Sequence, residues 1–233
     1  MTQTKISQRN QKVAINRWKT IHTKEIDRLK NIENVPKYKL LKSKLMGYLV
    51  GDGGVYIRLE KRGNVHCSIS FYPDDELMLN TFISAFNEYY NKIPTIKNLD
   101  TYYTVRCESK VIVEDLMKTA KYDALNWTIP LDYLETEEMI IEWIRAYFDC
   151  EAHVNSYSIR VQSVNEKGLI EIQKLLKRLD IDSSLYKYKR KNPNWNINYI
   201  LSIQKKESRL NYMKKIGFNH DRKTKALHKY LLP

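Results

Sequence analysis

Two short apolar segments, far apart in the chain, repeat one design, and this repeat constrains the fold more than any other feature. Residues 45–53 form an apolar stretch that ends with Asp52 and a glycine, and residues 144–152 form another that ends around Glu151. In both stretches small residues recur at a spacing of one helical turn. The sequence therefore predicts two similar helices, one in each half of the chain.

The small residues of the two helices define a predicted helix interface. They are Gly47, Gly51, Ala146 and Cys150. Short side chains let helix backbones approach more closely than the usual separation of roughly 8–10 Å. Gly53, just past the first helix, favours a C-terminal turn. Two such helices packed side by side would bring Asp52 and Glu151 together at one end of the pair.

Paired carboxylates are the ligands that hard divalent metal ions prefer, particularly beside phosphate oxygens. Asp52 and Glu151 are therefore the candidate catalytic and metal-binding residues. The alternative is that both segments are ordinary core helices with an acid at a fraying end. The matched pair favours the metal site over that alternative.

The chain is strongly basic, which points to a polyanionic partner. Its 233 residues carry 40 Lys and Arg against 27 Asp and Glu, a formal net charge of +13. Nucleic acid fits this balance first and an anionic membrane surface second. The 17 tyrosines favour nucleic acid, because Tyr can lie along a sugar–phosphate backbone while cations neutralise it.

The cysteines and the hydropathy of the chain indicate in which cellular compartment the protein is expected. The three cysteines, Cys67, Cys107 and Cys150, have no CxxC spacing, which argues against a disulfide framework or a structural zinc site and for a reducing interior. No stretch approaches the roughly 20 apolar residues of a membrane span, and the N-terminus has no apolar signal region. We therefore expect an intracellular protein, in the cytoplasm, nucleoid or an organelle matrix, with no membrane partner.

Hydrophobic periodicity predicts the same order of elements in each half: helix, two strands, helix, two strands, helix. The predicted fold is α+β, with two pseudo-symmetric αββαββα halves, motif helices packed at their interface, and curved antiparallel sheets that form a saddle. The basic extension at the N-terminus is either a helical arm that lies on DNA or RNA, or a basic, partly disordered leader. The predicted parts are this extension (1–43), a first half (44–120), a linker (121–136) and a second half with a basic C-terminal helix (137–233).

The two motifs, the linker and the tail resemble, in this order, those of the LAGLIDADG homing endonucleases in their single-chain, two-motif form. The tail is similar to the way many archaeal members end. The matching segments are residues 45–56, Trp127-Thr128-Ile129-Pro130, residues 143–154 and Ile216-Gly217-Phe218-Asn219-His220. The resemblance runs from about residue 40 to the C-terminus and leaves the basic extension outside it.

This resemblance implies an intron-encoded, monomeric nuclease that cuts both strands of double-stranded DNA at a long target site and leaves 3′ overhangs. Asp52 and Glu151 would each hold Mg²⁺, for which Mn²⁺ would substitute. The carbonyls of Gly51 and Cys150 would be further ligands. Asp149 is common in the family at its position and is expected to cap or pack the helix end rather than bind metal.

The sequence departs from the family pattern in one place. Many members have a Lys or Gln near the end of the second strand of a half, and a Lys shortly after the second acid. Here the first half has Phe71-Tyr72-Pro73 at the end of that strand, and Val154 stands three residues after Glu151. The candidate substitutes are Gln162, Lys61 and Arg62.

Polar side chains that alternate outward along the strands are the natural readers of base edges and phosphates. Each of them is alternatively a phosphate contact or a solvated strand residue, because one sequence does not fix strand register. The candidate DNA-binding residues of the first half are Arg58, Lys61, Arg62, His66, Ser68, Ser70 and Arg106, and those of the second half are Arg160, Gln162, Tyr186, Lys187, Tyr188, Lys189, Arg190, Lys191 and Asn198.

Three other functions are open at this point. The main one is an RNA maturase, or a cleavage-inactive protein that binds nucleic acid and promotes intron splicing; intron RNA is then the partner. A transcription regulator would normally show a helix-turn-helix, which only residues 1–43 could hold, and the pattern there is poor. A nucleotide site at residues 51–54 lacks the P-loop lysine and the third Rossmann glycine. Intact acids at both motif ends favour cleavage.

Overall fold

The structure, a computed structural model, has two compact units, residues 1–39 and residues 40–233. In the first unit the described residues form a helix over positions 19–32. No helix in the part of the chain that the structure describes is long and apolar enough to cross a membrane. The structure describes residues 19–59, 63–189, 194 and 196–232.

The first half of the larger unit follows the predicted order of elements. Asp75 and Ser109 cap two of its helices, because their side chains accept the backbone N–H groups of Met78 and Ile112. The elements are α2 (Pro36–Gly51), β1 (Gly53–Leu59), β2 (Val65–Phe71), α3 (Glu76–Tyr90), β3 (Thr95–Asn98), β4 (Tyr103–Glu108) and α4 (Lys110–Met117).

The second half repeats this order and adds a C-terminal helix. Thr136 and Asn165 cap its first two helices in the same way. The predicted α+β fold with two αββαββα halves is therefore confirmed. The elements are α5 (Glu137–Glu151), β5 (His153–Val154), β6 (Ile159–Ser163), α6 (Glu166–Arg178), β7 (Ser184–Tyr188), β8 (Asn198–Ile203), α7 (Lys206–Lys215) and α8 (Asp221–Leu231).

Each half contains one four-stranded antiparallel sheet, and the two sheets have the same topology. Their strand orders are β1-β2-β4-β3 and β5-β6-β8-β7. In both sheets the second and fourth strands form the central pairing, and the third strand lies at an edge. The two halves are therefore structural repeats, as the duplicated motif predicts.

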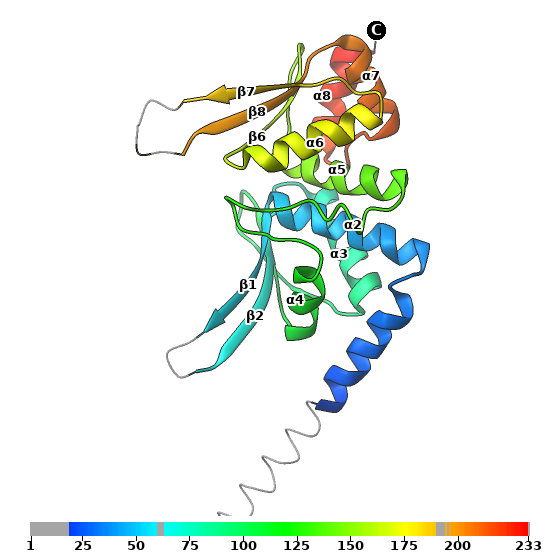
Figure 1. Cartoon of the computed structure of the whole chain (residues 1–233), viewed down its shortest axis with the longest axis vertical. Helices are drawn as coiled ribbons and strands as arrows, with labels where there is room; N and C mark the ends of the chain where they lie inside the picture. Colours follow the sequence, from blue (N-terminus) through cyan, green and yellow to red (C-terminus); the bar gives the residue numbers. More distant parts are fainter. Residues whose placement is uncertain (1–18, 60–62, 190–193, 195, 233) are drawn as a thin grey trace, which may run out of the picture. The chain divides into compact units, whose positions relative to one another are not determined.

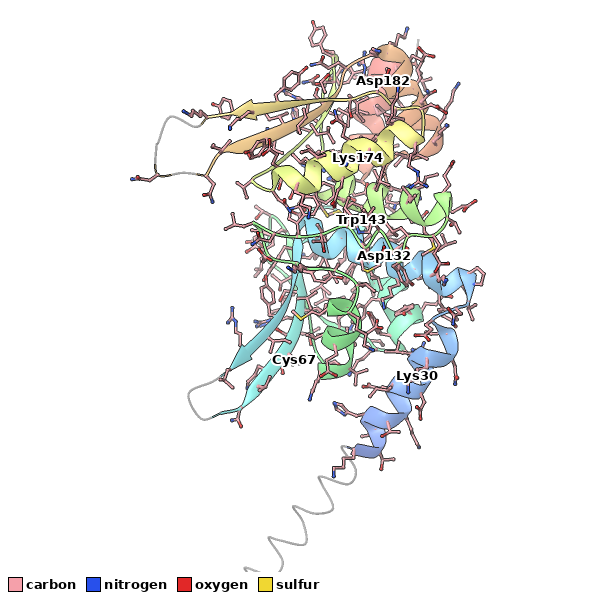
Figure 2. All side chains as sticks on the ribbon, in the orientation of Figure 1. Lys30, Cys67, Asp132, Trp143, Lys174 and Asp182 are labelled. Carbon is pink, nitrogen blue, oxygen red and sulfur yellow. The ribbon has the colours of Figure 1, made fainter. Side chains whose placement is uncertain are left out.

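The two motif helices, α2 and α5, lie side by side between the sheets (Figure 1). A Cβ atom added at Gly47 would lie 2.9 Å from the Cβ of Ala146, and one added at Gly51 would lie 2.8 Å from the Sγ of Cys150. Trp143, a fully buried residue of α5, lies in the interior close to this contact (Figure 2). The small residues thus let the two backbones approach closely.

Gly53 has a different role from the one that the sequence suggested. Among the chain's glycines only Gly63 and Gly217 have a positive φ, at 78° and 66°. A Cβ added at Gly53 would lie 2.8 Å from both the Cα of Leu49 and the carbonyl oxygen of Ser70. The prediction of a glycine-dependent turn is therefore wrong; a glycine is needed here because β1 starts tightly against α2 and β2.

Candidate active site at the ends of the paired helices

The two predicted acids stand at equivalent ends of the motif helices. Asp52 directly follows α2, and Glu151 is the last residue of α5; both are partly buried. Burial raises the pKa of Glu151 from 4.5 to about 7, and the negative charge of Asp52 adds to this rise. The two carboxylates therefore lie within electrostatic reach of each other.

Cys150 brings the end of α5 against the end of α2. Its thiol donates to the carbonyl oxygen of Tyr48, with the Sγ at 3.8 Å. Burial raises the pKa of the thiol well above its ordinary value. Cys150 is therefore a protonated donor that joins the helices, because a nucleophile or a thiolate ligand needs a lowered pKa.

Asp149 anchors the C-terminal segment of the chain, in agreement with the packing role that we expected. Its fully buried carboxylate accepts hydrogen bonds from the Tyr48 hydroxyl at 3.0 Å and from the backbone N–H groups of Asn219 at 2.8 Å and His220 at 3.2 Å. Burial raises its pKa to about 6, and these hydrogen bonds oppose the rise. Asp149 therefore ties α2, α5 and the segment that leads into α8 together.

Lys223 belongs to the basic C-terminal helix predicted from the sequence, but its place beside the two acids was not predicted. It projects from the first turn of α8 to the C-terminal end of α5, where its Nζ donates to the Cys150 carbonyl at 2.8 Å and to the two carbonyls before it. Burial raises the pKa of both Asp52 and Glu151, and the charge of Lys223 opposes each rise. In a chain with 40 Lys and Arg, no local signal distinguishes this inward-facing lysine from its neighbours.

The segment that positions Lys223 also contacts the first half of the chain. The His220 side chain is 2% exposed and lies between Asp74 and Asp75, at 3.3 Å and 3.4 Å. These two acids precede α3, and Asp75 also caps it. The start of α8 is therefore held by both halves of the unit.

A cavity of about 340 Å³ lies beside Glu151, lined in part by Gln162 and Asn198. The Asn198 Nδ2 donates to the Gln162 Oε1 at 2.8 Å and so fixes the amide. The pairing of the first hairpin, extended by one residue, sets Tyr72 opposite Asp52, and in the second half Gln162 lines the same cavity as Glu151. The Tyr72 N–H indeed donates to the Asp52 carbonyl at 2.9 Å. The halves thus differ here: an amide in the second and a phenol in the first.

The donors at the helix ends fit a divalent cation. Two carboxylates that repel each other in a partly buried place gain from a hard cation between them. The described residues contain no cluster of three or more His, Cys, Asp or Glu side chains that could hold a metal ion. A metal would therefore rely on Asp52, Glu151 and backbone carbonyls. Two carbonyls were predicted as ligands. That of Cys150 already accepts a hydrogen bond from Lys223, and that of Gly51 belongs to the last residue of α2.

One face of the first sheet carries the described members of the predicted DNA-binding set. Register places Arg58 opposite His66 and Ser70 opposite Arg106, with Ser68 on the same side. The other side of these strands holds the buried core residues of β2 and β4. Ser70 is only 2% exposed and offers the least surface of the five.

The second sheet has an equivalent polar face. Arg160 and Gln162 of β6 lie on the same side as Tyr186 and Tyr188 of β7, and both tyrosines are exposed. Lys187 lies on the opposite side, because neighbouring strand residues alternate. Lys189 follows β7 and is exposed. The remaining predicted residues, Lys61, Arg62, Arg190 and Lys191, lie outside the described residues.

Comparison with known proteins agrees with this architecture. Residues 138–217 match the family described as "LAGLIDADG-like domain". An uncharacterized protein of Methanocaldococcus jannaschii is 27% identical over 94% of this chain and 81% of its own length. The homing endonuclease I-DmoI, in complex with DNA and Mn, superposes with a TM-score of 0.63 and 17% identity, over 77% of this chain and 97% of that one.

The same fold also occurs in WhiA from Thermatoga maritima, with a TM-score of 0.54 and 15% identity over 87% of this chain and 64% of that one. At these identities the likeness to solved structures concerns the fold. Together with the match at residues 138–217, it confirms the resemblance expected from the sequence: that segment is similar to a LAGLIDADG-like domain, and the chain has the fold of a two-motif LAGLIDADG homing endonuclease.

Proposed function

We propose that this chain, with its LAGLIDADG-like domain, is a site-specific endonuclease that cuts double-stranded DNA. It would hydrolyse one phosphodiester bond on each strand with a divalent metal ion and leave 3′ overhangs. The observation that carries the proposal is the pair of acids, Asp52 and Glu151, at the ends of two helices packed through small residues. A pure binding protein has no need for two converging carboxylates.

Each group at the helix ends has a place in this proposed reaction. Asp52, Glu151 and the Gly51 carbonyl would hold Mg²⁺ or Mn²⁺, with the Cys150 carbonyl shared with a lysine. A cation bound there would polarise the scissile phosphate and lower the pKa of the attacking water. The fixed amide of Gln162 lies in the cavity beside Glu151 and is placed to orient a water molecule there.

Double-stranded DNA is the proposed partner, bound by a monomer over a long target site. The net charge of +13 supplies the sequence-independent attraction to phosphates. The exposed polar faces of the two sheets supply the candidate base contacts. I-DmoI has been crystallised in complex with DNA and either Mn or Ca, which supports the choice of DNA and of a divalent metal ion.

The test is cleavage of a plasmid library that carries random inserts, in the presence of Mg²⁺, followed by sequencing of the ends of linear products. We expect linear product with a shared recognition sequence. Asp52→Asn and Glu151→Gln should abolish it and leave DNA binding nearly unchanged, because binding depends on the distributed basic surface. The matched control is Glu114→Gln, which removes an exposed carboxylate far from the helix ends in sequence. Linear product that survives both active-site substitutions would refute the assignment of the acids.

The alternative function is that of an RNA maturase or a cleavage-inactive binding protein for intron nucleic acid. Tyr72 favours it, because the position opposite Asp52 lacks an amide such as the one that Gln162 supplies beside Glu151 in the second half. Its test is the splicing rate of a candidate intron transcript with and without the protein. Accelerated splicing together with no linear plasmid would support this alternative and refute the nuclease.

A further inference from the structure

The ammonium group of Lys223 binds the Cys150 carbonyl, which the sequence predicts to be a metal ligand. Its Nζ is 2.8 Å from the Cys150 carbonyl oxygen and also contacts the two preceding carbonyls of α5. A helix C-terminus carries a partial negative charge, so a cation is stabilised there. Burial lowers the pKa of Lys223, while the surrounding acids, Asp52 among them, act in the opposite direction.

This positive charge is held in place rather than carried on a free surface. The backbone just before α8 is bound to the buried carboxylate of Asp149, through the N–H groups of Asn219 and His220. The His220 side chain is enclosed by Asp74 and Asp75. Because both halves of the unit hold the start of α8, the backbone of Lys223 is fixed beside the end of α5, and its ammonium group leaves only by breaking its hydrogen bonds to the α5 carbonyls.

A fixed cation at this point has a definite effect on metal binding. It offsets the repulsion between Asp52 and Glu151, which is the same favourable effect that a divalent ion would have. It also repels a second cation, and a charge of +2 feels this repulsion twice as strongly as a charge of +1. Finally, it occupies the Cys150 carbonyl, one of the few oxygen ligands near the acids.

We propose that Lys223 is a resident counter-ion of the Asp52–Glu151 pair and that it competes with divalent metal in the DNA-free protein. The inference deepens the proposed function, because it concerns the same metal site. It makes Lys223 a positioning residue for metal and carboxylates rather than a group that contacts substrate. It also predicts that the DNA-free protein binds divalent ions weakly.

The test is a titration of the full-length, DNA-free protein with Mn²⁺, followed by the electron paramagnetic resonance signal of free Mn²⁺. We expect Lys223→Gln and Lys223→Met to bind Mn²⁺ at least about tenfold more tightly than wild type, because the competing charge is gone. Lys223→Arg keeps the charge and should stay near wild type. Lys225→Gln is the matched control, since Lys225 is an exposed lysine of α8 that pairs with Asp221.

The direction of the effect separates this role from a merely structural one. A substitution that only disturbed folding would weaken Mn²⁺ binding, so tighter binding requires an intact site. Adding Glu151→Gln to Lys223→Gln should remove the gain and thereby locate the ion at the acids. Unchanged or weaker Mn²⁺ affinity in both Lys223→Gln and Lys223→Met would overturn the proposal, as would an equal gain in Lys225→Gln. A wild-type protein that fails to cut DNA would refute the nuclease but leave this titration, made without DNA, fully informative.

Discussion

Replacing Glu151 by Gln should stabilise the protein in the absence of DNA and metal, although it removes an acid proposed to be catalytic. Burial, and then the charge of Asp52, raise the pKa of Glu151 from 4.5 to about 7 in the folded protein. The folded state therefore binds this proton more tightly than the unfolded state does. The stability that results is fully present below about pH 4.5 and is lost as the pH rises through about 7.

The size of the effect follows from the pKa shift. One pKa unit corresponds to about 1.4 kcal/mol, so ionising Glu151 in the folded protein costs about 3 kcal/mol at full effect. Partial exposure of the carboxylate screens it and reduces this cost. We therefore expect Glu151→Gln to raise the free energy of unfolding by about 1–3 kcal/mol near pH 8.5 and by little near pH 4.

The assay is urea denaturation of the full chain in EDTA at both pH values. Glu114→Gln is the matched control, because Glu114 is half exposed and lies 3.6 Å from Lys110; its effect should stay within about 0.5 kcal/mol. The double variant with Glu151→Gln and Asp52→Asn should gain less free energy of unfolding than the sum of the two single gains. Each single substitution already removes the repulsion between the two carboxylates. A Glu151→Gln protein that is no more stable than wild type near pH 8.5 would refute the view that the Glu151 carboxylate is buried beside a second acid.

Three further predictions concern packing, anchoring and DNA binding. Gly47→Val should lower the free energy of unfolding, measured in urea, by at least about 2 kcal/mol, because even a Cβ at this position lies 2.9 Å from the Cβ of Ala146. An unchanged free energy of unfolding would contradict the close helix contact. Asp149→Ala should cost about 3 kcal/mol or more in thermal denaturation, because the buried Tyr48 hydroxyl and the backbone N–H groups of Asn219 and His220 lose their acceptor. A loss below about 1 kcal/mol would count against this anchor. Arg160→Ala should weaken duplex DNA binding and reduce the slope of log affinity against log salt by about one, and an identical slope would remove Arg160 from the DNA interface.

Local sequence patterns were sufficient to predict most of the fold. Small residues four apart predict the close helix pair, alternation predicts the strands, and capping residues such as Asp75 and Ser109 mark where helices begin. Each of these signals lies within a few residues of the element that it specifies. The repeat of the whole pattern then predicts two equivalent halves, and Asp52 and Glu151 follow as the residues at equivalent helix ends.

Only the tertiary structure decided what surrounds those two acids. Strand pairing, which placed Tyr72 beside Asp52 and Gln162 in the cavity beside Glu151, depends on contacts between segments and not on the pattern of either one. Lys223 reaches the end of α5 across more than 70 residues of chain, because the buried carboxylate of Asp149 captures the backbone before α8. Periodicity reports which face of an element is buried, but it carries no information about which distant charge is buried against it. The helices and their acids are therefore written in the local sequence, whereas the electrostatics of the site arise from long-range packing.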